Sequence, residues 1–373
     1  MKKPNIGILT FPISEAGNIP LSNLVEILNP LSNNLYLVTG NDGYTFFKDY
    51  GGVRTYGIDH ESGKNMITRV TKYIYTQLRI SYQLAKVAKN VDLWIFFIGG
   101  QDLLFPMLTA KLLRKKVILA FASSSVLGLK STDDNFFKPM KILLKINCTL
   151  SDRITLCSEN LAEDWNLEKY RDRISIAYEH FLDFDEFKMK KKNGERDDLL
   201  GYIGRLSGEK GVLNFIKAIP LILKQRNDLE FLIGGDGPLR DQIEKYLAEK
   251  NLNDKIKLVG WIPHNELPDY LNELKLLVIP SYTESGPLIA LEAMSCGTPI
   301  LATPVGHIPN IVKDGKTGFI TENNSMECIA KNVIRGLEHP NLDEIAKNAR
   351  RLVEKEFTYE AAVEKYRMTL EDI

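Results

Sequence analysis

Short apolar runs alternate with helical patterns along almost the whole of this 373-residue chain. A strand buried on both faces gives a continuous apolar run, and a helix that follows it returns the chain to begin the next strand in parallel. The alternation therefore predicts an α/β fold with doubly wound parallel sheets covered by helices on both faces. The runs are 6–11, 35–38, 93–98, 117–121, 154–157, 174–178, 199–203, 229–233, 256–259, 276–279 and 300–302.

The alternation breaks between Asp183 and Asp198, where DFDEFKMKKKNGERDD has little apolar periodicity and is typical of a linker. The break predicts two domains, 1–184 and 185–356, and a chain with 44% apolar residues can build two such cores. The tail, 357–373, has an amphipathic pattern that predicts a terminal helix. Ligands of doubly wound folds bind beyond the carboxyl ends of the strands, so we expect the functional residues there.

The stretch 276–302, LLVIPSYTESGPLIALEAMSCGTPILA, predicts a strand, a loop that opens onto a helix, and another strand. Pro287 suits the first helical position, and Gly286 lets a phosphate approach the N–H groups of the helix N-terminus. Glu284 and Glu292 flank this point. Because carboxylates repel a diphosphate, we expect them to face hydroxyl groups on either side of it, as in a nucleotide sugar. Two glutamates at this spacing also arise by chance, so only the surrounding motif can indicate whether the pair is functional.

A second strand, loop and helix is predicted over 199–219, LLGYIGRLSGEKGVLNFIKAI, and its loop carries Arg205 and Lys210. A leaving nucleoside diphosphate gains negative charge, which fixed cations at a sheet edge stabilise. Arginine binds phosphate oxygens in pairs and lysine supplies a point charge. Taken alone, the pair is better explained as two solvated surface cations, so the surrounding motif is needed to assign it a function.

Together the two motifs resemble the retaining glycosyltransferases of family 4, also called glycosyl transferases group 1. ESGPLIALEAMSCGTPILAT is similar to their E-x₇-E signature almost throughout, and GRLSGEKG to their G-R-x₄-K-G element. The resemblance implies the GT-B fold, with two Rossmann-like domains facing across a cleft and the last helix packed back on the first domain. It also implies transfer of a hexose from a nucleoside-diphosphate sugar to a hydroxyl acceptor, with no cofactor and no metal.

The resemblance assigns roles to the motif residues. Arg205 and Lys210 would stabilise the departing phosphate, and Glu284 would hold the hexose hydroxyls; these three form the expected catalytic set. Glu292 would hold the ribose. FLIGGDGPLRDQIE and LVGWIPHNELPDYL match elements near the nucleotide and its base. The expected donor-binding residues are Gly17, Gly204, Gly235, Ile262, Ser285, Gly286, Pro287, Leu288 and Glu292.

The match is strong over 198–322 and diffuse over the first 180 residues. After the first strand, Gly17 stands alone where relatives have a glycine pair, and after 117–121 Ala122 or Ser123 replaces their histidine. The segment IAYEHFLDFDEF also lacks their Asn-Gly. The missing histidine leaves open an alternative, a non-catalytic subunit that keeps the donor fold and serves a partner enzyme. A nucleotide-sugar epimerase is a third possibility, which the E-x₇-E loop disfavours.

Other residues could in principle act in catalysis or bind a metal, but a structural role explains most of them. His264 is typical of a surface histidine at a helix start, with ligand contact as the alternative, and His307 either lines the sugar pocket or is exposed in a loop. The Asp183-Phe184-Asp185 segment mimics a D-x-D metal motif but lies in the predicted linker, which indicates a structural role. The cysteines lack metal-site spacing, which predicts buried thiols in a reducing, cytoplasmic setting; they are Cys148, Cys157, Cys296 and Cys328.

The formal net charge is zero, which disfavours nucleic acid as a partner. Residues 66–89 and 136–150 nevertheless combine apolar residues with eight Lys or Arg and no acid. Basic amphipathic segments can lie on anionic membranes, although each could also be a core-facing helix with a solvated basic face. No apolar run is long enough to span a bilayer. We therefore expect a cytoplasmic protein and leave open peripheral contact with the inner membrane face and a lipid-linked acceptor.

Overall fold

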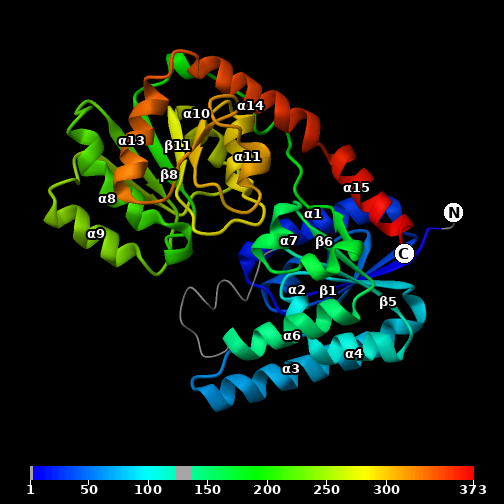
Figure 1. The fold of residues 1–373 in the computed structure, drawn as a ribbon. Coiled ribbons are helices and arrows are strands. Elements are labelled where there is room, and N and C mark those ends of the chain that lie inside the picture. The colour runs from blue at the N-terminus through cyan, green and yellow to red at the C-terminus, as the bar shows by residue number, and fades with distance from the viewer. Residues whose placement is uncertain (1–2, 123–136) are drawn as a thin grey trace. The chain divides into compact units, whose positions relative to one another are not determined.

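The computed structural model describes residues 3–122 and 137–373, and the chain forms two compact units. Unit 1 comprises Met1–Phe181 and Tyr359–Ile373, and unit 2 comprises Leu182–Thr358. Each unit contains one parallel sheet with helices on both faces (Figure 1). The doubly wound α/β architecture predicted from the alternating apolar runs is confirmed.

The sheet of unit 1 has the order β3-β2-β1-β4-β5-β6-β7. The chain starts in the middle at β1, winds outward to β3, and returns at β4 to wind the other way. Strand β3 was not predicted, because its residues, VRTYG, lie partly exposed at the sheet edge and form no apolar run. The strands are β1 (Asn5–Leu9), β2 (Asn34–Thr39), β3 (Val53–Gly57), β4 (Leu93–Phe96), β5 (Lys116–Ala120), β6 (Arg153–Leu156) and β7 (Ile174–Ile176).

The C-terminal helix belongs to unit 1. Ala362 and Tyr366 of this helix share an apolar core with Leu21 and Leu24 of α1, and the Tyr359 hydroxyl donates to the Glu26 carbonyl oxygen at 3.0 Å. In Figure 1, α3, α4 and α6 cover the opposite face of the sheet from α1 and α15. The helices of unit 1 are α1 (Asn18–Leu28), α2 (Asp42–Phe47), α3 (Met66–Val87), α4 (Leu104–Leu112), α6 (Phe137–Leu150), α7 (Asn160–Asp164) and α15 (Tyr359–Glu371).

The sheet of unit 2 has the order β10-β9-β8-β11-β12-β13. As in unit 1, the chain starts in the middle, at β8, winds outward to β10, and returns at β11 to wind the other way. Its strands are β8 (Leu199–Ile203), β9 (Glu230–Gly234), β10 (Ile256–Gly260), β11 (Leu276–Ile279), β12 (Ile300–Ala302) and β13 (Phe319–Ile320). Its helices are α8 (Val212–Leu223), α9 (Arg240–Glu249), α10 (Leu267–Glu273), α11 (Leu288–Ser295), α12 (Ile308–Ile311), α13 (Met326–Leu337) and α14 (Leu342–Glu356).

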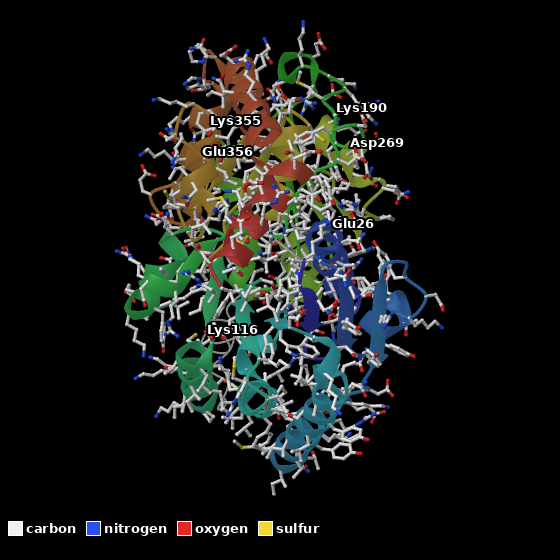
Figure 2. All side chains as sticks on the ribbon, turned by 90° about the vertical axis from the view of Figure 1, so that its right-hand side faces the viewer. Glu26, Lys116, Lys190, Asp269, Lys355 and Glu356 are labelled. Atoms are coloured by element: carbon white, nitrogen blue, oxygen red, sulfur yellow. The ribbon has the colours of Figure 1, made fainter. Side chains whose placement is uncertain are left out.

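The segment predicted as a linker is part of unit 2. Phe187 is buried, and its carbonyl oxygen accepts a hydrogen bond from the Ser295 hydroxyl at 2.6 Å. The Asn272 side chain accepts from the backbone N–H of Lys190 at 2.7 Å, and Lys190 also pairs with Asp269 (Figure 2). The sequence did not predict this packing, because backbone groups make most of these contacts and leave no pattern in the side chains.

Candidate active site

The order of the strands brings two predicted motifs together in unit 2. The chain leaves β8 for β9 and β10 on one side, then returns to place β11 on the other side of β8. Ligands bind at such a switch point, beyond the carboxyl ends of the strands. Arg205 and Lys210 follow β8, and Glu284 follows β11, so all three lie on loops at the switch point.

Lys210 and Glu284 contact each other directly. The Lys210 ammonium lies 2.7 Å from Glu284 Oε1, and the Ser281 hydroxyl donates to the same oxygen at 2.7 Å. The Glu284 side chain is only 6% exposed, whereas that of Lys210 is 32% exposed. The backbone of Glu284 is equally confined, because a Cβ at Gly306 would lie 1.4 Å from its carbonyl oxygen. The carboxylate is therefore held in one position.

Arg205 presents its guanidinium to solvent. Its side chain is exposed and makes no hydrogen bond or ion pair with the residues that the structure describes. Its backbone is anchored, since the buried Tyr202 hydroxyl donates to the Arg205 carbonyl oxygen at 2.7 Å. Burial raises the pKa of Tyr202, and the carboxylates of Glu284 and Glu209 raise it further, so the hydroxyl stays a donor. Arg205 is thus a free cation on a fixed loop.

The loops after β8, β9 and β10 pack backbone against backbone. Gly235 has a φ of +119°, and a Cβ there would lie 1.9 Å from the carbonyl oxygen of Gly204. The Gly235 N–H donates to the Gly260 carbonyl oxygen at 2.6 Å. Ile262 packs over the neighbouring Gly234, where a Cβ would lie 2.6 Å from the isoleucine Cδ1. The structure therefore gathers Gly204, Gly235 and Ile262 at the same sheet edge as Arg205.

Helix α11 begins one residue later than predicted. Pro287 is its N-cap residue and Leu288 its first helical residue, so Pro287 precedes the helix. Pro287 is buried, while Ser285, Gly286 and Leu288 are half exposed. The N–H group of Ala290 in the first turn donates to the Pro287 carbonyl oxygen at 2.9 Å, which leaves the N–H groups of Leu288 and Ile289 beside the Glu284 loop.

Glu292 forms a second acid-base contact that the sequence did not reveal. Its Oε1 lies 2.9 Å from His264 Nε2, and its side chain is 4% exposed against 40% for the histidine. The hydrogen bond to Glu292 raises the pKa of His264 above its usual value. His264 is half exposed just before α10, which agrees with the favoured interpretation of a surface histidine, and it also contacts the predicted ribose ligand. Only the strand order, which places α10 beside α11, brings these residues together.

Other predicted features have mixed outcomes. His307 is buried at the start of α12, so of its two alternatives the exposed loop histidine is wrong, and the lining of a sugar pocket stays a prediction. The Asp183 carboxylate accepts hydrogen bonds from the backbone N–H groups of Asp185 and Glu186, at 2.9 and 3.1 Å, and so caps a turn. Cys148, Cys157 and Cys296 are buried as predicted, but Cys328 is only half buried, and its thiol donates to the Glu322 carboxylate at 2.9 Å.

The expected residues of unit 1 are placed less completely. Gly17 ends a 3₁₀ turn between β1 and α1, where a Cβ would lie 3.1 Å from the Ile13 side chain. Ala122, which follows β5, is half exposed, and Ser123 lies outside the described residues. Gly17 therefore belongs to the switch point of unit 1, where β1 and β4 are neighbours.

Comparison with known proteins identifies proteins that this chain resembles. The family described as glycosyl transferases group 1 matches residues 183–353, nearly all of unit 2. Alpha-D-kanosaminyltransferase of Streptomyces kanamyceticus is 31% identical over 50% of this chain and 50% of its own length. The chain thus spans about half the length of the first curated relatives that it matches. N-acetyl-alpha-D-glucosaminyl L-malate synthase of Bacillus anthracis is 25% identical over 100% of this chain and 97% of its own length.

Solved structures share the fold of the whole chain. HepE of Anabaena in complex with UDP and glucose has a TM-score of 0.76 at 16% identity and covers 98% of this chain and 99% of its own. Sucrose-phosphate synthase of Thermosynechococcus elongatus has a TM-score of 0.77 at 21% identity and covers 99% and 98%. The family match includes the segments that carry the motifs after β8 and β11, and the solved structures share the fold of both units. Residues 183–353 match the glycosyl transferases group 1 family, and the chain as a whole has the GT-B fold.

Proposed function

We propose that the protein is a retaining glycosyltransferase that moves a hexose from a nucleoside-diphosphate sugar to a hydroxyl acceptor. The switch point of unit 2 carries this proposal, because it combines the exposed Arg205, the Lys210–Glu284 pair and the first turn of α11. Cations and N–H groups suit a diphosphate, and a fixed carboxylate beside them suits sugar hydroxyls. Relatives whose names denote sugar transfer support the same activity.

The proposed roles follow from the contacts. Oε1 of Glu284 is occupied by Lys210 and Ser281, while within the described residues Oε2 accepts no hydrogen bond and remains for hexose hydroxyls. Lys210, which is partly exposed, can contact a phosphate oxygen without leaving the carboxylate. Glu292, oriented by His264, would accept hydrogen bonds from the ribose hydroxyls. In each pair, one basic side chain fixes the acid that binds a hydroxyl group.

For the reaction, we propose front-face substitution. The bond between the anomeric carbon and the phosphate oxygen breaks, and the acceptor oxygen forms its bond on the same face. The acceptor proton passes to an oxygen of the departing phosphate. Arg205, Lys210 and the α11 N–H groups stabilise the charge that this phosphate gains, a role that takes the place of a divalent metal. The resemblance of the Glu284–Glu292 spacing to a retaining signature supports retention.

A panel of nucleotide sugars tests the enzymatic claim against the alternative of a non-catalytic subunit. Incubating the protein with UDP- and GDP-linked hexoses should release free sugar slowly from one of them, because water can replace the acceptor. The release should be lost in Arg205→Ala. Binding of a donor without release by wild-type protein, even with candidate acceptors present, would favour the non-catalytic subunit.

For the acceptor, we propose a lipid-linked hydroxyl compound presented at a membrane surface. Helix α3 has two apolar faces. One packs on the sheet through Ile80, Leu84 and Val87. The other is exposed to solvent and consists of residues spaced three to four or seven apart: Ile67, Ile74, Tyr75, Leu78 and Tyr82, which are 40–77% exposed. A core-facing helix with a solvated basic face would have only the first of these stripes.

The neighbouring helices extend the exposed apolar face. Helix α4 packs against both α3 and α6, so the three form one layer. Helices α4 and α6 and the residue after α4 add Leu108, Leu112, Leu113, Ile142 and Ile146, which are 37–83% exposed. The three helices contain several lysines and arginines and no acidic residue. Large contiguous apolar patches on a protein surface mark interaction sites, and the positive charge selects an anionic membrane as the partner.

A cavity beneath this layer supports a lipid ligand. It has a volume of about 560 Å³ and lies between the starts of α3, α4 and α6. Most of its lining is apolar, including Met66, Ile74, Leu104 and Leu143, and Arg69 contributes a cation. Its size is in the range of small-molecule sites. An acyl or prenyl chain would fit the apolar lining, with an anionic headgroup near Arg69. No helix in the described part of the chain is long and apolar enough to cross a membrane.

A further inference from the structure

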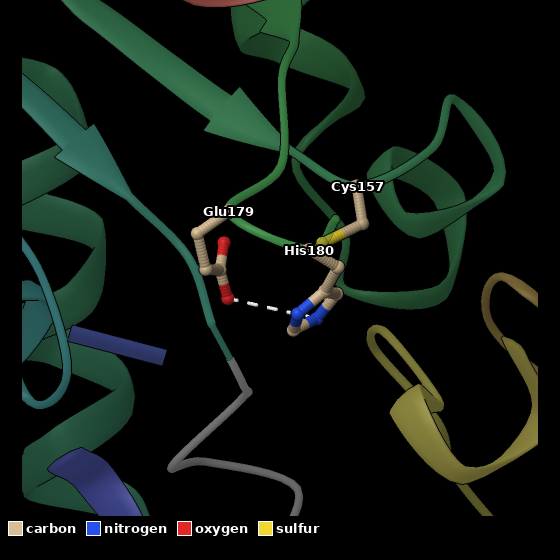
Figure 3. A group of neighbouring side chains, drawn as sticks. All are labelled: Cys157, Glu179 and His180. Atoms are coloured by element: carbon tan, nitrogen blue, oxygen red, sulfur yellow. Dashed lines mark ion pairs between the residues drawn. The ribbon is translucent and has the colours of Figure 1, made fainter. Parts of the chain in front are cut away.

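Three side chains with metal-binding atoms meet at the end of the sheet in unit 1. Cys157 follows β6, and Glu179 and His180 follow the adjacent β7 (Figure 3). One potential ligand atom of each, the thiol sulfur, a carboxylate oxygen and a ring nitrogen, lies within 4.8 Å of the other two. The two segments are more than 20 residues apart, so no local spacing in the sequence could reveal the cluster.

All three side chains are buried, and two of them have a polar atom without a hydrogen-bond partner. Cys157 and Glu179 are each 2% exposed and His180 is 7% exposed. Oε1 of Glu179 and Nδ1 of His180 form no hydrogen bond within the described part of the chain. Glu179 Oε1 lies 3.6 Å from His180 Nε2, which is beyond hydrogen-bond distance. A buried carboxylate oxygen without a hydrogen-bond donor is costly, and a cation shared by the three groups would offset that cost.

The chemistry of the cluster selects the kind of cation. Mg²⁺ and Ca²⁺ prefer oxygen ligands only, whereas thiolate, imidazole and carboxylate together are typical of zinc. Bonds of 2.0–2.3 Å in tetrahedral geometry place ligand atoms about 3.3–3.8 Å apart, so distances within the cluster would shorten by at most about 1.5 Å from the 4.8 Å limit. We propose that Cys157, Glu179 and His180 bind a divalent transition-metal ion of the zinc class.

Three protein ligands leave one tetrahedral position for water or another oxygen ligand. Binding would displace the thiol proton, since zinc binds thiolate. It would also join the ends of β6 and β7 just before the chain leaves unit 1 at Phe181. The site consists only of unit 1 residues and contains none of the donor-binding residues proposed in unit 2. The inference therefore stands independently of the proposed transfer reaction.

Metal analysis of the full-length protein tests the proposal. Wild-type protein produced with zinc, then freed of loosely bound ions by dialysis, should retain about one equivalent by elemental analysis. Cys157→Ser and His180→Asn should lose it. The matched control is Cys148→Ser, which removes another buried thiol of unit 1 and should keep the metal. Protein loaded with Co²⁺ should show a thiolate-to-cobalt charge-transfer band in wild type and Cys148→Ser but not in Cys157→Ser.

A wild-type protein that retains no stoichiometric metal and shows no such band would overturn the proposal, and the three residues would then be a histidine-carboxylate pair beside an inert thiol. Retention of metal in Cys157→Ser would overturn the ligand assignment equally. If a variant fails to fold, the wild type still decides. Zn²⁺ should raise its melting temperature after chelation, because a ligand specific for the folded state stabilises it, and an unchanged melting temperature would contradict the site.

Discussion

In the proposed reaction, charged side chains that follow the strands of unit 2 stabilise the departing diphosphate. Arg205 is the clearest case, because its guanidinium is exposed while its loop is anchored by Tyr202. Replacing Arg205 or Lys210 with Ala should lower kcat by about 10²-fold or more, as the loss of a transition-state charge contact typically does. Lys217→Ala, which removes an exposed cation from α8, is the control and should leave kcat unchanged. Initial rates of donor turnover provide the measurement. A kcat near that of the wild type in both Arg205→Ala and Lys210→Ala would contradict their role in stabilising the departing phosphate.

His264 and Glu292 give a residue-scale prediction about pH. The pKa of His264 is raised in the folded protein by the hydrogen bond to Glu292. The stabilisation from the protonated pair is therefore fully present below the unfolded pKa of about 6.5 and is lost as the pH rises through the folded value. The difference in unfolding free energy between wild type and His264→Gln should be larger at pH 6 than at pH 9. Urea unfolding at the two pH values measures this difference, and an equal difference at both would show that the histidine does not titrate with the pair.

Sequence and structure agree on which residues gather at the switch point, and disagree on how they are paired. Arg205, Lys210 and Glu284 were predictable because each follows an apolar run at a position where a strand should end. The Lys210–Glu284 contact was not, because the sequence gives strands but not their order, and the pair exists only because β8 and β11 are neighbours. The contact between His264 and Glu292 could not be predicted for the same reason, because it also depends on the order of the strands.

At the scale of elements, buried polar contacts hold unit 2 together where apolar patterning is weak. Arg196 lies in the predicted linker, yet it is buried, and it donates to the carbonyl oxygens of Leu274 and Cys296 at 2.8 and 2.6 Å and to the Thr298 hydroxyl at 2.6 Å. Burial lowers its pKa to about 10. The guanidinium thus connects the strand entry at β8 to the ends of α10 and α11. Sequence patterns could not show this, because a charged residue in a polar stretch is normally solvated.

Replacing Arg196 with Met should destabilise unit 2 by about 3 kcal/mol or more, since several buried acceptors would lose their donor. Arg226→Ala removes an arginine whose ion pairs with Asp198 and Asp228 are partly exposed, and should cost about 1 kcal/mol or less. Urea unfolding of both variants gives the comparison. Equal stabilities would mean that the carbonyl oxygens around Arg196 find other donors.

For the whole molecule, the uneven distribution of charge and apolar surface predicts membrane attachment in a chain of zero net charge. Wild-type protein should sediment with anionic but not with zwitterionic liposomes. Changing Lys138, Lys141 and Lys145 of α6 to Glu should release it, because each cation near an anionic surface contributes about 1 kcal/mol. Exchanging Ile67, Leu78 and Tyr82 for Ser should also release it, through the loss of apolar contact.

Reversing Lys245 and Lys250 of unit 2, which are also exposed, is the matched control and should leave sedimentation unchanged. High salt should weaken the attachment by screening. A wild-type protein that ignores anionic liposomes at low salt would make the exposed face of α3 a site for another kind of partner, and a soluble acceptor would become the better proposal.

Metal dependence is a second property of the whole molecule. Because cations and N–H groups surround the proposed diphosphate site, transfer should continue in a chelator that removes Mg²⁺. Assays with and without chelator, followed by addition of Mg²⁺ or Zn²⁺, test this expectation. Loss of activity that Mg²⁺ restores would contradict it, whereas restoration by Zn²⁺ alone would implicate the cluster around Cys157 instead.

The anomeric configuration of the first product distinguishes the proposed retaining transfer from an inverting one. Proton NMR at early times, before the released sugar mutarotates, can follow the hexose formed from the donor that the panel identifies, or the glycoside formed with an acceptor. Front-face substitution should keep the α configuration of an α-linked donor in the first product, and Glu284→Gln should greatly slow the appearance of that product. A first product of inverted, β configuration would contradict the proposed front-face reaction at the β8–β11 switch point.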